Sequence, residues 1–430
     1  MRSARVILTA LAALGTLPAD SAAQASPGQE GTFVIRGATV WTGTGQTLEN
    51  VNVVIRDGRI EAVGPNAAAT GATEIDGRGR FVYPGMIDAY TPLGLSEIGG
   101  ISTMNLRSEM GEFNPHMRAV VAINVDSDMM AITRANGVTT AITAPSGGLI
   151  SGQAALVNMA GWTWEDMAVE QSAAFVLNYP REPSFGFRGG PPNPAQERAA
   201  RERIEAQIRD LETVLATARA YDGQRAAGSQ QTDLMYEALR PLVRGEVPAL
   251  ISADTEEQIR AAVELGREYG LKVIINGGRE AWKVRELLAA NDVPVVLGSL
   301  QSNPAADAPY DAIFAQPGVL HEAGVRFAFS TGGAANARHV PYHAALAVGF
   351  GLPKDVAMQA LTIWPAQMFG AADQIGSIEA GKVATLFVTS GDPLDIRSQV
   401  SDVFIKGRRV PMDDRHTRLY EKYNARPGGS

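Results

Sequence analysis

The feature that most constrains the fold of this chain is a repeat of short apolar segments, each followed by a polar, helix-forming stretch. This alternation is typical of parallel βαβ units. Eight such segments within about 290 residues favour an α/β fold of the (β/α)8 barrel type, whereas the glycine-rich motif of a dinucleotide-binding doubly wound sheet is missing. The predicted strands are 86–89, 138–143, 154–158, 173–177, 247–251, 272–275, 293–297 and 326–330.

Both ends of the chain are richer in β-forming residues than the middle. Residues 33–41 and 51–63 are dense in Val, Ile and Thr, and the second run contains the strong hairpin signal Asp57-Gly58. Residues 403–410 near the carboxyl terminus have a similar composition. We therefore expect a small, discontinuous β-sandwich domain assembled from both termini. The expected domain limits are 26–84 with 377–411 for the β-sandwich and 85–376 for the barrel.

An insertion at about 179–236 interrupts the barrel between its fourth and fifth strands. It opens with a Pro- and Gly-rich loop and continues into a polar helix, for which Asn193 is the expected N-cap and Pro194 the first residue. We interpret this helix as a solvated excursion on the barrel, with a lid or a partner-binding arm as the alternatives. Residues 412–430 form a polar tail that is expected to fray.

The first 25 residues have the pattern of an export signal. A basic start precedes an apolar stretch at 6–17, and Ala23-Gln24-Ala25 has the small residues of a cleavage site. We expect removal of 1–25, which leaves a secreted or periplasmic protein that begins near Ser26. The apolar stretch is shorter than a membrane-spanning helix, and nothing comparable follows it.

Charge and cysteine content exclude several classes of function. The chain has 38 Lys+Arg against 46 Asp+Glu, a net charge of −8 that is spread along its length. No basic region is therefore available to neutralise a nucleic-acid backbone. The chain has no cysteine, which removes thiolate nucleophiles, disulfides and cysteine-bound metals. Its chemistry must use oxygen and nitrogen groups.

Short motifs spread over nearly the whole mature chain carry a family resemblance. They are Asp57-Gly58-Arg59-Ile60, Pro84-Gly85-Met86-Ile87-Asp88-Ala89-Tyr90-Thr91-Pro92, Ala335-Asn336-Ala337-Arg338, Trp364-Pro365-Ala366 and Ile375-Gly376-Ser377-Ile378-Glu379-Ala380-Gly381-Lys382. In this order they resemble the amidohydrolase superfamily, in particular its imidazolonepropionase-like and prolidase-like branch. The resemblance implies a β-sandwich plus a (β/α)8 barrel. It also implies hydrolysis of C–N bonds with one or two divalent metals at the carboxyl-terminal mouth of the barrel.

The positions that hold metal in that family carry other residues here. Tyr90 and Pro92 stand where the resemblance implies a His-x-His pair, and neither replaces imidazole as a zinc ligand. The other altered positions are Asn178 on the fourth strand, Ser252 or Asp254 on the fifth, Asn276 or Gly277 on the sixth, and Gly332 on the eighth. We therefore expect no metal cofactor. Zinc held by His339 and His343, four residues apart, is the alternative.

Two functional hypotheses follow from these substitutions. In the first, the chain is a metal-free pseudoenzyme that binds a small molecule at the barrel mouth, or that serves an intact amidohydrolase paralogue or a second copy as a partner subunit. The residues expected to bind the ligand are Tyr90, Asn178, Ser252, Asn276 and Thr331. In the second, an exported hydrolase of C–N bonds uses a divergent site, with Asp254 and Glu280 as candidate catalytic residues.

Two further features have structural interpretations. Asp254 is also the expected N-cap of the helix that follows it, with Glu257 as its capping-box partner. The glycine-rich stretch 146–153 lacks the lysine of a phosphate-binding P-loop. We interpret that stretch as backbone that shapes the barrel mouth.

Overall fold

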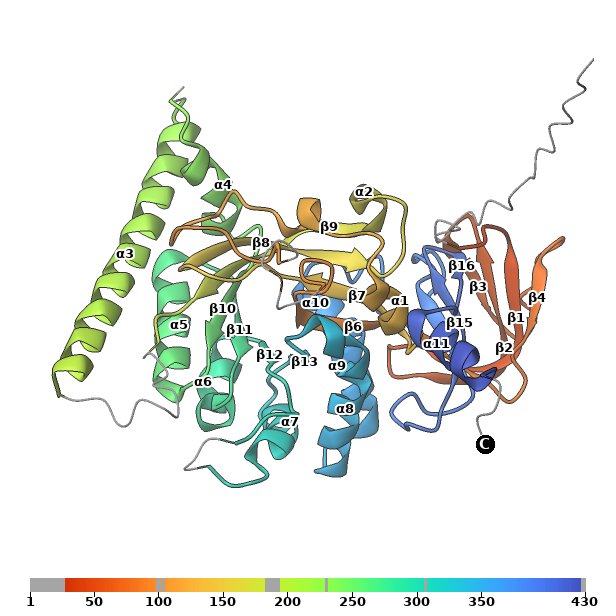
Figure 1. Ribbon diagram of the computed structural model, residues 1–430. Coiled ribbons are helices and arrows are strands. Elements are labelled where there is room, and N and C mark those ends of the chain that lie inside the picture. The colour runs from red at the N-terminus through yellow and green to blue at the C-terminus, as the bar shows by residue number, and fades with distance from the viewer. Residues whose placement is uncertain are drawn as a thin grey trace, which may run out of the picture.

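The computed structural model describes residues 28–97, 101, 105–181, 194–228, 231–304 and 308–426. The predicted signal peptide at 1–25 lies outside these ranges. Figure 1 shows a barrel at the centre of the molecule, with a β-domain at one end and the long helix α3 (Pro194–Ala226) at the other.

The barrel is a nearly closed sheet of eight strands in the order β13-β12-β11-β10-β9-β8-β7-β6. The strands are β6 (Met86–Thr91), β7 (Val138–Thr143), β8 (Ile150–Asn158), β9 (Ala168–Asn178), β10 (Ala249–Ala253), β11 (Val273–Gly277), β12 (Val295–Leu297) and β13 (Phe327–Phe329). All eight overlap strands predicted from the sequence, which confirms the barrel. Its first and last strands meet where the Gly332 N–H donates to the Tyr90 carbonyl at 3.1 Å.

One strand departs from the expected parallel order. β8 runs antiparallel to both β7 and β9. Only residues 144–149 connect β7 to β8, and so short a connection closes an antiparallel hairpin, whereas a parallel crossover needs about a dozen residues or more. The expectation of a parallel sheet was therefore wrong for β8.

Apolar side chains that alternate along the strands fill the barrel. Val176, Leu250 and Ile274 are buried members of this inner core. Because side chains on a strand alternate between two faces, the residue two positions further along points to the same side. At the carboxyl ends of β9, β10 and β11, these residues are Asn178, Ser252 and Asn276.

Helices cover the outside of the barrel. The α-helices are α1 (Asp128–Arg134), α2 (Trp164–Met167), α5 (Glu256–Tyr269), α6 (Arg285–Ala290), α7 (Ala312–Glu322), α8 (Val340–Gly349), α9 (Lys354–Leu361) and α10 (Ile363–Met368), and the 3-10 helices are η2 (Ala119–Ala122), η3 (Ala281–Val284) and η4 (Ala334–His339). Helix α5 shows how the sequence sets such limits. Thr255 and Gln258 form a reciprocal capping box at its start, and Gly270 ends it with a φ of 69°.

Strands from both ends of the chain form the β-domain, as predicted. The strands are β1 (Phe33–Trp41), β2 (Thr47–Arg56), β3 (Arg59–Gly64), β4 (Thr73–Asp76), β5 (Phe81–Pro84), β14 (Leu386–Thr389), β15 (Val400–Ile405) and β16 (Arg408–Val410). Their order is β16-β15-β14-β5-β1-β2-β3, with β4 beside β1. The antiparallel pair β5–β14 joins the amino-terminal and carboxyl-terminal parts.

This sheet curls over its own apolar core. Phe33 on β1 and Phe404 on β15 contact each other with ring centroids 5.2 Å apart, although β5 and β14 separate their strands within the sheet. The turns before β3 and before β16 also touch. A Cβ atom at Gly407 would lie 2.5 Å from the Cα of Gly58, and both residues have positive φ, so each turn requires glycine.

The insertion contains α3 and α4 (Leu234–Val243), and its loop at 182–193 lies outside the described residues. Leu211 and Leu215 on α3 are buried against the barrel's main core, whereas most of the residues before position 204 are exposed. The helix therefore lies on the barrel through its second half, and its first part is solvated.

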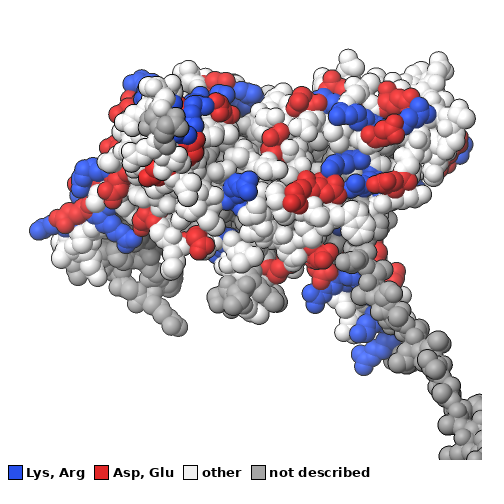
Figure 2. Space-filling view, turned by 90° about the horizontal axis from the view of Figure 1, so that it is seen from above, with Lys and Arg blue, Asp and Glu red and all other residues white. Residues whose placement is uncertain are grey.

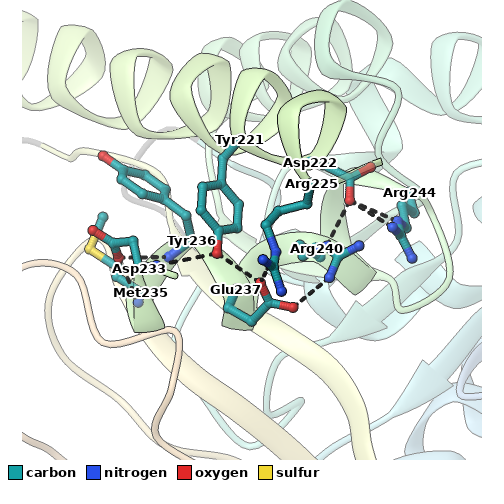
Figure 3. A network of polar contacts seen from close by, with 9 residues as sticks. All are labelled: Tyr221, Asp222, Arg225, Asp233, Met235, Tyr236, Glu237, Arg240 and Arg244. Atoms are coloured by element: carbon teal, nitrogen blue, oxygen red, sulfur yellow. Dashed lines mark hydrogen bonds and ion pairs between the residues drawn. The ribbon is translucent and has the colours of Figure 1, made fainter. Parts of the chain in front are cut away.

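A polar network fastens α3 to α4 (Figure 3). Asp222 accepts hydrogen bonds from Arg240 at 2.8 Å and from Arg244 at 2.9 Å. The Tyr221 hydroxyl donates to Glu237 at 2.8 Å. These contacts supplement the apolar packing of α3.

The polar tail is ordered into the helix α11 (Arg415–Asn424) rather than frayed along its whole length. The Asp414 carboxylate caps it by accepting from the N–H groups of His416 and Thr417, which is the local reason that a helix begins here. None of its side chains is buried. In the part of the chain that the structure describes, no helix is long and apolar enough to span a bilayer.

Candidate functional site at the barrel mouth

Two adjoining cavities open at the carboxyl ends of the barrel strands. The outer cleft has a volume of about 780 Å³ and lies between the loop at 146–149, the ends of β9 and β10, and α3. The inner pocket has a volume of about 280 Å³ and lies over the ends of β11, β12 and β13. Tyr90 and Asp254 line both cavities. Together they make one elongated mouth.

The five residues predicted to bind a ligand all border this mouth. Tyr90 lines both cavities, Asn178 and Ser252 line the outer cleft, and Asn276 and Thr331 line the inner pocket. Four of these side chains are partly exposed, and Thr331 is buried. Burial raises the pKa of Tyr90 above its ordinary value of 10, at which a phenol is already neutral at pH 7.

Hydrogen bonds between neighbouring strands hold several of these side chains in place. The Asn178 amide donates to the Gly148 carbonyl at 2.8 Å and to the Ser151 hydroxyl at 3.0 Å. The Asn276 amide donates to the Ser252 hydroxyl at 3.2 Å. These strand-end side chains are therefore neutral groups held by their neighbours.

Asp88 is a buried carboxyl group beneath the mouth that the sequence reasoning missed. Its Oδ1 accepts from the Thr331 N–H at 3.0 Å, and its Oδ2 lies 2.5 Å from the Thr331 hydroxyl. Burial raises its pKa from 3.8 to about 7, although the bonds from Thr331 and Tyr90 act in the opposite direction. A charged residue between Ile87 and Ala89 in an apolar strand was the available signal.

The two candidate catalytic residues differ in their surroundings. Asp254 is not the N-cap of α5, because Thr255 and Gln258 form the capping box one position later. The Asp254 side chain instead borders both cavities. Glu280 accepts from the N–H of Glu256 at 2.8 Å and pairs with Lys283 at 2.7 Å, so its carboxylate supports the start of α5.

His339 and His343, the two histidines of the zinc alternative, have different hydrogen-bond partners. His339 lies at the N-cap of α8, where its Nε2 accepts from Arg338 at 3.0 Å. His343 is buried, and its Nδ1 lies 3.0 Å from the Ser330 carbonyl, to which it donates. Burial lowers the pKa of His343 to about 4, which keeps the ring neutral.

The donor groups at the mouth do not fit a divalent metal. Zinc sites in proteins use imidazole, thiolate and carboxylate ligands, whereas the strand ends here present mainly a phenol, amides and hydroxyls, and the carboxylates lining the mouth are those of Asp254 and Glu112. Within the described ranges, no three His, Cys, Asp or Glu side chains form a group that could hold a metal ion.

Known proteins share both the fold and parts of the sequence. The family model described as "Amidohydrolase family" matches residues 310–410. The crystal structure of an amidohydrolase from Thermotoga maritima MSB8 is 25% identical, with a TM-score of 0.78 over 88% of this chain and 99% of that one. The chain belongs to the amidohydrolase superfamily. This membership confirms the resemblance carried by the motifs.

Two curated superfamily members match parts of their own length. Amidohydrolase tasK of Hapsidospora irregularis is 24% identical over 421 residues, which cover 87% of this chain and 42% of that protein. Imidazolonepropionase of Klebsiella pneumoniae (strain 342) is 27% identical over 155 residues, which cover 32% of this chain and 38% of that protein. The chain thus aligns with less than half the length of these curated relatives.

Proposed function

We propose that this chain is a metal-free, catalytically inactive member of the amidohydrolase superfamily that binds a small polar molecule at its barrel mouth. The observation that carries the proposal is the chemistry of the mouth. Apart from Asp254, the alternative to Ser252 on the fifth strand, neutral residues occupy the positions where the family resemblance implies metal ligands. Asn178 and Asn276 are each hydrogen-bonded to a serine on a neighbouring strand.

Metal-assisted hydrolysis, the mechanism that the family resemblance implies, requires a set of metal ligands together with a general base, a combination that the mouth does not offer among the described residues. Metal-assisted hydrolysis needs an ion that lowers the pKa of bound water toward neutrality, and the mouth offers no matching set of ligands among the described residues. A general base must reach the proton it accepts. Asp88 is fully buried against Thr331, and the Nδ1 of His343 is directed at Ser330.

Ligand binding remains compatible with this lining. The mouth combines concave volume with fixed amide and hydroxyl groups, the features by which proteins orient small polar molecules. The hydrogen bonds of Asn178 and Asn276 hold these groups before a ligand arrives. Less side-chain entropy is then lost on binding.

Elemental analysis and turnover, measured on the same sample, test the proposal. We expect no stoichiometric zinc, manganese or iron after gentle purification, and no hydrolysis of amide substrates after incubation with one equivalent of zinc chloride. Asp254→Asn should change neither result. About one metal per chain, lost on chelation together with hydrolysis, would establish the alternative of an active C–N hydrolase.

The proposal extends to a partner and a location. The exposed first part of α3 supports a partner-binding role, with an intact amidohydrolase paralogue or a second copy of this chain as the partner. The pattern of residues 1–25 supports export to the periplasm or medium. Co-purification and N-terminal sequencing of exported protein test both. A monomer without a partner, or a chain that begins at Met1, would contradict them.

A further inference from the structure

We infer that the outer cleft binds the oxyanion group of its ligand, a carboxylate or a phosphate, through Arg181 and Arg203. This inference deepens the proposed ligand-binding function and rests on it for the identity of the site. Arg181 follows β9 and Arg203 lies on the first part of α3, and both line the outer cleft. The cleft thus receives cations from two separate elements.

Both guanidinium groups are available to a ligand. Both residues are exposed, and neither forms a hydrogen bond or an ion pair with any residue that the structure describes. Elsewhere in the same insertion, Arg240 and Arg244 share the Asp222 carboxylate (Figure 3). A guanidinium binds carboxylate or phosphate through two parallel hydrogen bonds, and such charge-assisted bonds are among the stronger ones in proteins.

Two glycines whose backbone N–H groups are unpaired within the described chain line the same cleft. Gly147 and Gly148 have φ values of 93° and 63°, and their N–H groups make no hydrogen bond with the described chain. The loop that carries them is fixed, because the N–H of Ser146 donates to Arg107 and the N–H of Leu149 donates to Glu112, each at 2.7 Å. Consecutive free N–H groups of this kind favour anions.

Gly148 cannot be exchanged for a larger residue at this position. A Cβ atom there would lie 2.8 Å from the carbonyl oxygens of both Gly111 and Glu112. Together with the positive φ, this close approach requires glycine.

The charges around the mouth also favour an anion. The outer cleft contains two arginines and the carboxylates of Glu112 and Asp254, and Asp254 shares the inner pocket with Arg279. Counted once each, three cations and two anions give the joined cavities a net charge of +1, in a chain whose total is −8. Figure 2 shows charges of both signs interspersed over the face it presents.

The inner pocket indicates the remainder of the ligand. Most of its polar lining is neutral, with hydroxyl and amide groups from Asn276, Ser299, Ser302, Gln316 and Thr331. Such groups bind uncharged hydroxyl or amide functions. The ligand class is therefore a small polar molecule with an oxyanion at one end.

Calorimetric titration of the full chain, after dialysis against a chelator, tests the inference. The probes are sodium succinate, inorganic phosphate and the neutral analogue succinamide, at low ionic strength. We expect at least one anion to bind about tenfold more tightly than succinamide, and Arg181→Gln or Arg203→Gln to weaken it by about 10- to 100-fold. Tighter succinate identifies a carboxylate site and tighter phosphate a phosphate site, and either supports the inference.

The matched control is Arg198→Gln, which removes an exposed arginine from the same helix but outside the cleft, and should leave affinity within about twofold. The inference is overturned if neither anion binds, or if the Arg181 and Arg203 variants bind like the parent chain. Because the protein is freed of metal, this result is independent of the elemental analysis. A metal-free, inactive chain that binds no anion would refute the oxyanion site alone.

Discussion

At the residue scale, Asp88 makes folding stability depend on pH. Its folded pKa of about 7 exceeds its ordinary value of 3.8, so the folded state retains a proton that the unfolded state releases between these values. Its stabilising contribution is therefore complete below about pH 4 and is lost as pH rises to about 7, a change on the order of 4 kcal/mol.

Asp88→Asn should remove this dependence of stability on pH, because an amide does not titrate in this range. The amide can also keep one bond in each direction with Thr331. Urea unfolding of both proteins from pH 4 to 8 measures it, with Thr331→Ser as a control that keeps the hydroxyl. Parallel stability curves for the parent chain and Asp88→Asn would contradict this assignment.

At the element scale, α3 depends on a few buried side chains in its second half. Leu215 is fully buried in the main core, whereas Leu234 at the start of α4 is 77% exposed. Leu215→Ala should therefore lower the free energy of unfolding by about 2–5 kcal/mol, through lost apolar contact and the cavity left behind. The matched change Leu234→Ala should alter it by no more than about 0.5 kcal/mol. Chemical denaturation measures the free energy of unfolding of both variants. If Leu215→Ala lowers it no more than Leu234→Ala does, the packing of α3 contributes little.

At the scale of the whole molecule, the β-domain needs both ends of the chain. Ending the chain at Gln374 removes β14, β15 and β16, which exposes the edge of β5 and uncovers Phe33. We expect aggregation and loss of cooperative melting, because an unpaired apolar edge strand invites pairing with other chains. Ending the chain at Asp413 removes α11, whose own side chains are all exposed, and should leave a soluble protein. Light scattering and calorimetry distinguish the two, and a soluble, cooperatively melting Gln374 truncation would contradict the dependence on both ends.

Local patterns in the sequence were sufficient for the strands, the turns and the polar ends of the barrel. The family resemblance located Asn178, Ser252 and Asn276 at the ends of their strands, and the alternation of side chains along a strand explains why all three face one mouth. The turn at Gly58 is readable for the same reason. The short link between β7 and β8 also contained the reason for their antiparallel pairing, since its length alone excludes a parallel crossover.

Only the tertiary structure decided which distant groups meet. Asp88 and Thr331 are 243 positions apart, and their contact exists because the barrel closes its first strand against its last. Arg181 and Arg203 share a cleft because α3 packs through Leu215 and leaves its first part beside the barrel mouth. Sequence spacing carries no information on such approaches, since they follow from how whole elements pack. The sequence by itself determined the barrel, the two-ended β-domain and the neutral residues at the strand ends. The packing decided that Asp88 is buried and that two arginines line one cleft.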